Sequence, residues 1–501
     1  MRGKRGFILI TIFIVLIVLS SCGVPEAPPI EMEEVSRETN ELFGQKNTEQ
    51  NALAYLDEEF YLQDGFNTHL PLLVMREDAS VDFYMEGGSF DLEKLAVPSA
   101  FRAGHAALWS EGASPGKPER IKLDYELEIA PEDLSEMGNA IWDTQVYGQW
   151  YLLGGMYDKS LLRNYLALTL ANEMGSAGYL VRYCEVFSEI EGTMKYQGVY
   201  LIAAAQQTTN YHFQRGNYWD EEAVALNTYA TEQGLLNEGL YTCSLNKLDD
   251  DQYSQLKAGI DKAEQSIYSW DYNAFSEYTK YVDSEKMYDY FLLYELFGNY
   301  DSAHLTRYLY NPAESAFWPV ASLDFEFSAD NAQKRPLDIH SIEMMETPYY
   351  TNLVKSTNFI KGLVDRYKQL NQDVLKSSNI DALIDETVQF LGESQIRDWA
   401  RWEDVYVGAD RYLLNADEEN EMAADLPALD RNAYSYSQEV NKLKFTLREH
   451  GQYIFAGLAT LYEEDDLIGD DASYVRNTWM FFIGLAIVIV SIRIVRYKTR
   501  G

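Results

Sequence analysis

The chain has 501 residues, of which 47% are hydrophobic and 14% aromatic, and its formal net charge at pH 7 is −38. This length and apolar content exclude a disordered chain and predict a folded body of two or three domains or lobes. The acidic charge argues against nucleic acid or an anionic lipid surface as a ligand of that body. Three cysteines, at positions 22, 184 and 243, are too few for a disulfide scaffold. Cys184 and Cys243 could pair or remain buried thiols.

Residues 1–22 predict an export signal that ends in a lipidation site. Basic residues at positions 2–5 precede the apolar run 7–19, which is too short for a membrane span. Cys22 ends a sequence similar to bacterial lipoprotein signals, in which the cysteine receives diacylglycerol and becomes the mature N-terminus. The alternative is an ordinary cleaved signal with a chance cysteine. Residues 23–67 are expected to form a tether and an acidic helical segment.

Residues 68–205 predict a region rich in β-strands. The apolar run 69–75 predicts a buried strand, and the alternating run 81–85 predicts its partner. A helix is expected to follow Asp158 or Ser160 as its N-cap and to stop at Gly175.

Residues 206–470 predict a mostly helical region that carries acidic motifs. A helix that begins after Asp283 is expected to break at Gly298 and to deliver Asp301 just past the break. The apolar run 317–327 predicts a strand, and on a strand Asp324 and Glu326 would share one face. Such carboxylates suit Mg²⁺ or Mn²⁺, because hard cations take oxygen ligands and are usually bound by one or two carboxylates plus substrate phosphates.

The apolar run at the C-terminal end predicts a transmembrane helix over residues 478–495. Basic residues follow it, which places the tail 496–501 in the cytoplasm and the body outside the cell membrane. An interfacial helix is the alternative, but the run has no polar face.

A helix is followed by an Asn-x-Asp motif at 299–301, by a strand-turn-strand unit and by an Asp-x-Glu motif at 324–326. This order resembles that of the CotH kinase family, the spore-coat-protein-H type of atypical protein kinase. Segment 150–164 is similar to the family's W-x-L-x-x-x-x-x-D-x-S-x-x-R motif, and Arg397–Trp402 resembles its R-D-x-x-R-W box. The box and the closing helix 439–453 are expected to serve packing. The resemblance covers residues 69–460 and indicates a membrane-anchored bacterial member.

The resemblance implies an α+β, two-lobed protein-kinase-like fold. Its N-lobe (68–205) would be a mixed, β-rich lobe and its C-lobe (206–470) mostly helical, followed by the C-terminal transmembrane helix. It also implies ATP with Mg²⁺ or Mn²⁺ as cofactors, and transfer of the γ-phosphate to Ser or Thr of a secreted, spore-coat or cell-surface protein. The membrane would be a further partner, through the Cys22 lipid and the C-terminal helix, whereas nucleic acid would not.

The resemblance also implies roles for particular side chains. Asp324, aided by Glu326, would hold the metal ion, and Asp301 would orient or deprotonate the acceptor hydroxyl. Lys117, with Arg102 as the second candidate, would hold the α- and β-phosphates of the nucleotide.

Departures from the family pattern support an alternative, a pseudokinase that serves as an envelope or spore-coat scaffold. Glu326 replaces the second Asp of the motif, Leu323 replaces its Trp, and Thr306 stands where protein kinases have a metal-binding Asn. Alanines occupy positions 203–205, where the family has an acid. A third hypothesis is a surface adhesin that binds through its many Tyr and Trp side chains.

Overall fold

The computed structural model describes most of the chain between residues 60 and 468. The described residues are 60–62, 65–108, 122–176, 178–215, 241–242, 248–303, 307–331, 337–407 and 433–468. All of them belong to one compact unit, residues 47–501.

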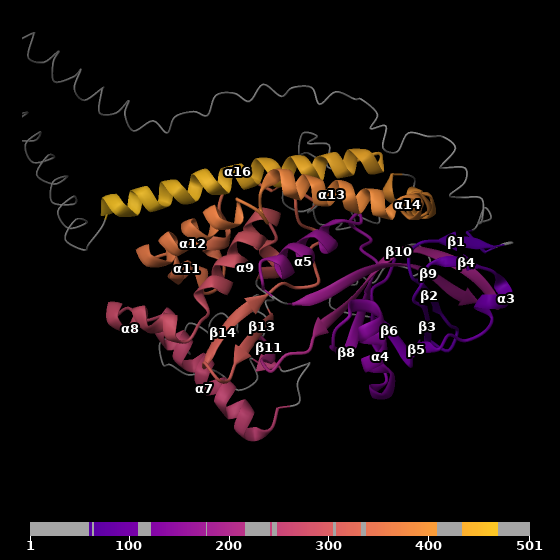
Figure 1. Ribbon diagram of the computed structural model, residues 1–501. Helices are drawn as coiled ribbons and strands as arrows, with labels where there is room; N and C mark the ends of the chain where they lie inside the picture. The colour runs from indigo at the N-terminus through magenta and orange to yellow at the C-terminus, as the bar shows by residue number, and fades with distance from the viewer. Residues whose placement is uncertain are drawn as a thin grey trace, which may run out of the picture. The chain divides into compact units, whose positions relative to one another are not determined.

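Eight of the described strands form one mixed sheet (Figure 1). They are β2 (Leu72–Met75), β3 (Val81–Tyr84), β5 (Phe101–Ala103), β6 (His105–Leu108), β7 (Tyr125–Glu128), β8 (Val146–Leu153), β9 (Tyr179–Ile190) and β10 (Thr193–Gln206). Their order is β5-β3-β2-β9-β10-β8-β7-β6. Only β2 and β9 pair in parallel; all other neighbours in this sheet are antiparallel. The predicted strands at 69–75 and 81–85 are therefore confirmed as β2 and β3.

The eight-stranded sheet is nearly closed on itself. Strands β5 and β6 lie at opposite ends of the strand order, yet Gly104 alone separates them in the chain. The N–H of Ala106 in β6 donates to the carbonyl of Ala79, which precedes β3, over 2.7 Å. The curled sheet encloses an apolar core that includes Phe83, Trp150 and Ile202. Helix α4 (Pro131–Trp142) contributes Met137 and Ile141 to the same core.

The remaining described elements pack around the large sheet or extend from it (Figure 1). A second sheet has the order β12 (Tyr241–Thr242), β11 (Tyr211–Arg215), β13 (Arg307–Asn311) and β14 (Ala316–Val320), and β1 (Phe66–Thr68) pairs with β4 (Gly88–Phe90). The helices are α3 (Leu92–Leu95), α5 (Arg163–Glu173), α7 (Asp250–Ile267), α8 (Tyr272–Ser276), α9 (Ser284–Phe297), α10 (Tyr300–Ala303), α11 (Tyr350–Leu353), α12 (Thr357–Leu370), α13 (Ser377–Leu391), α14 (Glu393–Tyr406) and α16 (Tyr436–Ile468), with short 3-10 turns at Glu277–Lys280 and Met344–Glu346.

Helix α9 is the buried centre of the helical part. Its N-cap Asp283 accepts a hydrogen bond from the N–H of Lys286, and it ends at Gly298, whose φ of 60° is left-handed. Glycine adopts that conformation at little cost, so the helix stops where the sequence predicts. The turn after it leads directly into α10, which contains Asp301.

The two-lobed, kinase-like fold that the resemblance implied is wrong; the fold is mixed α/β. Residues 47–501 form one compact unit, with no boundary near residue 205. Helix α14, from the supposed C-lobe, packs on β10 of the supposed N-lobe: Trp402 Nε1 donates to the carbonyl of Gln197 over 2.9 Å. The region predicted to be helical also contains the four-stranded sheet. Sequence patterns report local structure and could not show that these two regions share one packed interface.

Within the described ranges, no helix has both the length and the apolar content needed to cross a membrane. The transmembrane helix in the expected fold therefore has no counterpart in the described structure. Its segment, 478–495, lies outside the described residues, as do the tail 496–501 and the signal 1–22.

Candidate active site

Asp324 and Glu326 lie in a loop, not on a strand. Strand β14 ends at Val320, and residues 322–331, which we name the acidic loop, follow it as irregular turns. The prediction that both carboxylates share one strand face is therefore wrong. A spacing of two residues places side chains on the same face only in an extended strand. Asp324 and Glu326 lie beyond the end of β14, so their spacing does not predict a shared face.

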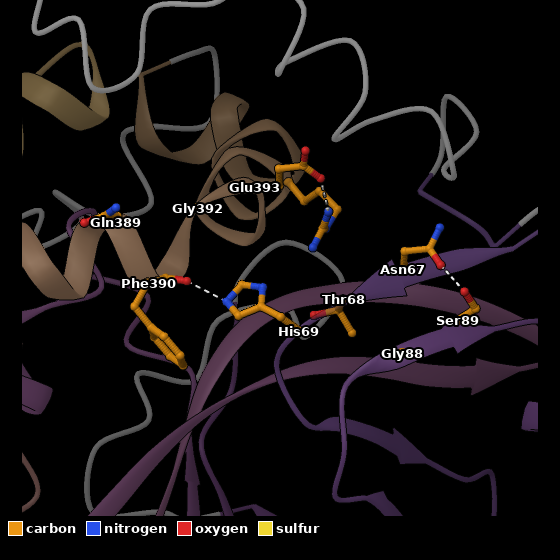
Figure 2. Close-up of a pocket in the computed structure, with 10 residues that line it drawn as sticks. Asn67, Thr68, His69, Gly88, Ser89, Gln389, Phe390, Gly392 and Glu393 are labelled. Atoms are coloured by element: carbon orange, nitrogen blue, oxygen red, sulfur yellow. Dashed lines mark hydrogen bonds and ion pairs between the residues drawn. The ribbon is translucent and has the colours of Figure 1, made fainter.

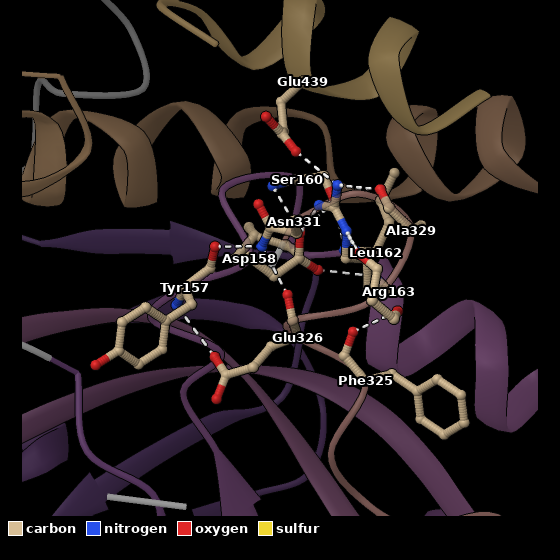
Figure 3. A network of polar contacts seen from close by, with 12 residues as sticks. Tyr157, Asp158, Ser160, Leu162, Arg163, Phe325, Glu326, Ala329, Asn331 and Glu439 are labelled. Carbon is tan, nitrogen blue, oxygen red and sulfur yellow. Dashed lines mark hydrogen bonds and ion pairs between the residues drawn. The ribbon is translucent and has the colours of Figure 1, made fainter. Parts of the chain in front are cut away.

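Backbone hydrogen bonds to neighbouring side chains hold the acidic loop in place. Asn299 Nδ2 donates to the carbonyl of Asp324 over 2.7 Å, and the N–H of Phe325 donates to Asn164 Oδ1 over 2.6 Å. Asn331 Nδ2 donates to the carbonyls of Glu326 and Tyr157 (Figure 3). The break after α9 thus contributes to the site through Asn299, which anchors the backbone at Asp324.

A buried arginine fastens the same loop to two helices (Figure 3). The side chain of Arg163, at the start of α5, is fully buried; its Nε donates to the carbonyl of Ser328 over 2.9 Å. Its two terminal nitrogens pair with Asp158 Oδ1 at 2.6 Å and with Glu439 Oε1 of α16 at 2.7 Å. The N-cap of α5 is Leu162, so the prediction of Asp158 or Ser160 at that position is wrong, but Asp158 Oδ2 does accept a hydrogen bond from the backbone N–H of Arg163 over 2.7 Å.

A third acidic side chain, Asp124, completes the acidic group. Asp124 precedes β7 (Tyr125–Glu128) and accepts a hydrogen bond from the N–H of Gly154 over 2.6 Å. Burial raises the pKa of Asp124 to about 6, and the charge of Asp324 contributes to this rise. Burial, followed by the charges of Asp124 and Asp324, raises the pKa of Glu326 well above its ordinary value. The three carboxylates therefore lie close enough to repel one another in a poorly solvated place.

The donor set of this acidic group fits a hard divalent cation. Carboxylate oxygens are the ligands that such ions prefer, and a cation would relieve the repulsion that raises the pKa values of Asp124 and Glu326. Within the described part of the chain, no three acidic, His or Cys side chains are arranged so that they could hold a metal ion by themselves. Mg²⁺ usually takes one or two carboxylates and completes its shell with water and substrate phosphates. The group therefore fits an ion that arrives with a phosphorylated ligand.

Next to the acidic group lies a buried ion pair between Lys122 Nζ and Asp398 Oδ1. Lys122 Nζ also donates to the carbonyl of Val199 over 3.2 Å, and Asp398 accepts from the N–H of Val199 over 2.8 Å. Burial lowers the pKa of Lys122, an effect that the attraction of Asp398 opposes. The positive charge of Lys122 in turn acts to lower the pKa of Asp124. The pair thus places a buried cation close enough to Asp124 to affect its pKa.

The other predicted site residues lie elsewhere or outside the description. Arg102, on β5, forms ion pairs with Asp78 at 3.4 Å and Asp82 at 3.5 Å, and its Nε donates to Ser80 Oγ over 3.1 Å. None of these partners belongs to the acidic group. Lys117 and Cys22 lie outside the described residues, and so does the side chain of Asp301, although its backbone belongs to α10.

The structure also describes some of the cysteines and of the positions that depart from the family pattern. Cys184 is a free, buried thiol, whereas Cys243 and Thr306 lie outside the described residues. The alanines at 203–205 are fully buried in β10, paired with β9.

The sequence analysis missed three residues that the structure brings to the site. Lys122 and Asp124 stand in the same short segment as Lys117, the residue to which the family resemblance assigns the phosphates. Asp398 belongs to the Arg397–Trp402 box, for which the sequence predicts a packing role. The sequence signal for Asp398 is its position next to Arg397 on an amphipathic helix. A charge that such a helix buries needs a partner.

The family model described as "CotH kinase protein" matches residues 113–454, which is more than half of the chain and includes the acidic loop, Lys122 and Asp398. A search of curated proteins finds no match to the chain.

Proposed function

Because the chain belongs to the CotH kinase protein family, which implies ATP-dependent phosphotransfer, we propose that it transfers the γ-phosphate of ATP to a Ser or Thr hydroxyl of a secreted, spore-coat or cell-surface protein. The observation that supports this proposal is the group of Asp124, Asp324 and Glu326 beside the buried Lys122–Asp398 pair. Such an arrangement suits a nucleotide whose phosphates bring a divalent cation.

In this proposal Asp324 and Glu326 hold a Mg²⁺ or Mn²⁺ ion, with Asp124 nearby as a third acid. When bound, the ion neutralises the negative charge that develops on the transferring phosphoryl group. Arg163 and Asn299 act as positioning residues, because they fix the backbone that carries the two acidic side chains. Precise placement is what phosphoryl transfer chiefly needs from a protein.

The remaining roles come from the family resemblance. Asp301 would orient or deprotonate the acceptor hydroxyl, and its position just after α9 keeps it in the same region of the chain as Asn299. Lys117 would hold the α- and β-phosphates. Arg102 is the weaker candidate, since its guanidinium already pairs with Asp78 and Asp82.

We further propose that the body acts outside the cytoplasm, at the cell membrane. The basic and apolar segments of residues 2–19 support export, and Cys22 supports a lipid tether. Labelling with a radioactive fatty acid in a bacterial host tests the tether: wild-type chain should incorporate label, and Cys22→Ser should not. Label retained in Cys22→Ser would contradict lipidation at this residue.

Nucleotide binding is tested by thermal unfolding of the full chain with millimolar ATP and Mg²⁺ or Mn²⁺. A ligand at about 100 times its Kd stabilises the folded state by about 2.7 kcal/mol, which should raise the unfolding midpoint by roughly 3 °C in a protein of this size. Asp324→Asn should lose this rise. The matched control Asp404→Asn, at an exposed position on α14, should keep it.

Transfer is then measured with ATP labelled at the γ-phosphate, by incorporation into envelope proteins from a bacterial culture. Asp301→Asn should bind nucleotide like wild type but transfer no label. The pseudokinase scaffold is the second candidate, supported by Glu326 and Thr306 at the motif positions and by the alanines at 203–205, which are fully buried in β10. A wild-type chain without any midpoint rise would favour that scaffold and contradict the kinase.

A further inference from the structure

A second candidate site lies apart from the acidic loop, in a cavity of about 660 Å³ (Figure 2). Its walls come from the two-stranded sheet β1–β4, which supplies Asn67 and Ser89, and from the junction of α13 and α14. We propose that this cavity binds an oxyanion, either free in solution or carried on a side chain. The proposal does not depend on the proposed kinase activity.

The first observation is a buried guanidinium with an unused donor. The Arg397 side chain is 1% exposed, and its Nε and Nη2 pair with Glu185 Oε1 and Oε2 at 2.9 and 3.0 Å. Nη2 also donates to Ser394 Oγ. Nη1 is itself buried and has no hydrogen-bond acceptor among the described groups, and Arg397 is among the residues that line the cavity. An unsatisfied donor on a buried cation is costly, so an acceptor from outside the chain would be stabilising.

The second observation is the start of α14 at the cavity wall. Gly392 is the N-cap and supplies no side-chain hydrogen bond to the first turn of this 14-residue helix. N–H groups at a helix start carry partial positive charge and are common ligands of anions. The carbonyl of Phe390, near the end of α13, would repel an anion. This oxygen already accepts a hydrogen bond from His69 Nε2, over 2.5 Å.

A carboxylate of the chain itself stands near the unused donor. Glu393 Oε2 lies 3.7 Å from Arg397 Nη1, which is too long for a hydrogen bond, and the Glu393 side chain is 45% exposed. Glu393 can therefore turn toward solvent when another anion arrives. Because Glu185 balances the guanidinium charge and Glu393 repels an anion, directed hydrogen bonds provide the affinity, which we expect to be millimolar.

The rim of the cavity offers a further donor. Ser89 Oγ donates to Asn67 Oδ1, which leaves the Asn67 amide nitrogen as a donor at the cavity (Figure 2). Asn67 and Ser89 are both exposed, so substitutions there can change the site without disturbing the core.

The test is titration calorimetry of the full chain with sodium sulfate, against sodium chloride at equal ionic strength. Wild type should bind sulfate specifically. Ser89→Asp, which adds a like charge, should weaken binding at least tenfold, whereas the matched control Ser89→Asn should not. Glu393→Gln should tighten binding about fivefold, because it removes the repulsion between the carboxylate and the anion. Fivefold corresponds to the interaction energy that is typical of partly exposed charges.

A parallel titration with N-acetyl-phosphoserine amide identifies the source of the ion. Tighter binding than sulfate assigns the site to a phosphorylated side chain, and equal binding assigns it to a free ion. Asp324→Asn should leave the sulfate affinity unchanged. The proposal is overturned if wild type binds neither probe, if Ser89→Asp and Ser89→Asn behave alike, or if Asp324→Asn abolishes binding, because the ion would then occupy the nucleotide site.

Discussion

Lys122 and Asp398 form an ion pair whose side chains are 0% and 1% exposed, although one residue precedes β7 and the other lies on α14. Asp398 accepts two further hydrogen bonds, from the N–H of Val199 at 2.8 Å and from the hydroxyl of Tyr406 at 3.2 Å. The pair therefore joins the large sheet to the helical part, next to the acidic group.

Removing one member of this pair should be strongly destabilising. Asp398→Leu leaves the Lys122 ammonium buried without its partner, which should lower the free energy of unfolding by about 3–5 kcal/mol. The double variant with Lys122→Met should recover much of that loss, because no unpaired charge remains. Urea unfolding measures both. Lys280→Met, which breaks the exposed pair with Glu277, is the control and should leave the unfolding free energy almost unchanged. If the loss of unfolding free energy in the double variant equalled the sum of the losses in Asp398→Leu and Lys122→Met, this account would be wrong.

Gly198 should be intolerant of a side chain. Its φ is +115°, and a Cβ there would meet Asp398 Oδ1, with Trp402 Nε1 at 3.0 Å. Gly198→Ala combines a strained backbone with displacement of the buried carboxylate, so we expect a loss of about 2–4 kcal/mol in unfolding free energy. Gly192, in the β9–β10 turn, has a φ of +72° with open space around it. Gly192→Ala should therefore cost only about 1 kcal/mol, and equal losses at both positions would show that crowding at Gly198 is unimportant.

Asp124 should make the metal-free protein less stable as the pH rises. Its pKa is raised from 3.8 to about 6, so folding favours the protonated acid. Stability should fall as the pH rises from about 4 to 6 and then remain lower, because the charged form is disfavoured in the folded state. Asp124→Asn should accordingly stabilise the protein at pH 7.5 by on the order of 1–3 kcal/mol, and the gain should disappear below about pH 4.

The measurement is urea unfolding in the presence of a chelator at several pH values. Adding millimolar Mg²⁺ with ATP should reduce the advantage of Asp124→Asn, since a bound cation removes the repulsion. A variant that is less stable than wild type at pH 7.5 without metal would contradict the assigned direction of the pKa shift.

Arg163 should control the order of the acidic loop. Arg163→Lys keeps the charge but cannot reach Asp158, Glu439 and the carbonyl of Ser328 together, so we expect a loss of about 2–4 kcal/mol. Hydrogen exchange of residues 325–331 should also become faster. Arg366→Lys, which perturbs the Arg366–Asp289 pair, should leave exchange in this loop unchanged. Unchanged exchange in Arg163→Lys would show that Asn164 and Asn299 hold the loop by themselves.

The local elements that the sequence predicts well are those with strong short-range signals. Asp283 and Gly298 bound α9 in the sequence and in the structure, because a cap and a left-handed glycine act within one turn of the chain. The family resemblance is likewise confirmed, with a match over residues 113–454. The strand expected at 317–327 ends early at Val320; Leu323 and Phe325 are buried from a loop, whereas Phe327 is exposed.

The sequence by itself determined the family and the bounds of elements such as α9, because each of the motifs and caps involved is formed by residues that are near one another in the chain. Only the tertiary structure decided that Lys122 pairs with Asp398, that Asp124 lies beside Asp324 and Glu326, and that the two supposed lobes form one body. Those relationships depend on which surfaces are buried against each other, and burial is also what shifts the pKa values of the acids. A buried charge selects its partner by proximity in the folded chain, which no local pattern encodes.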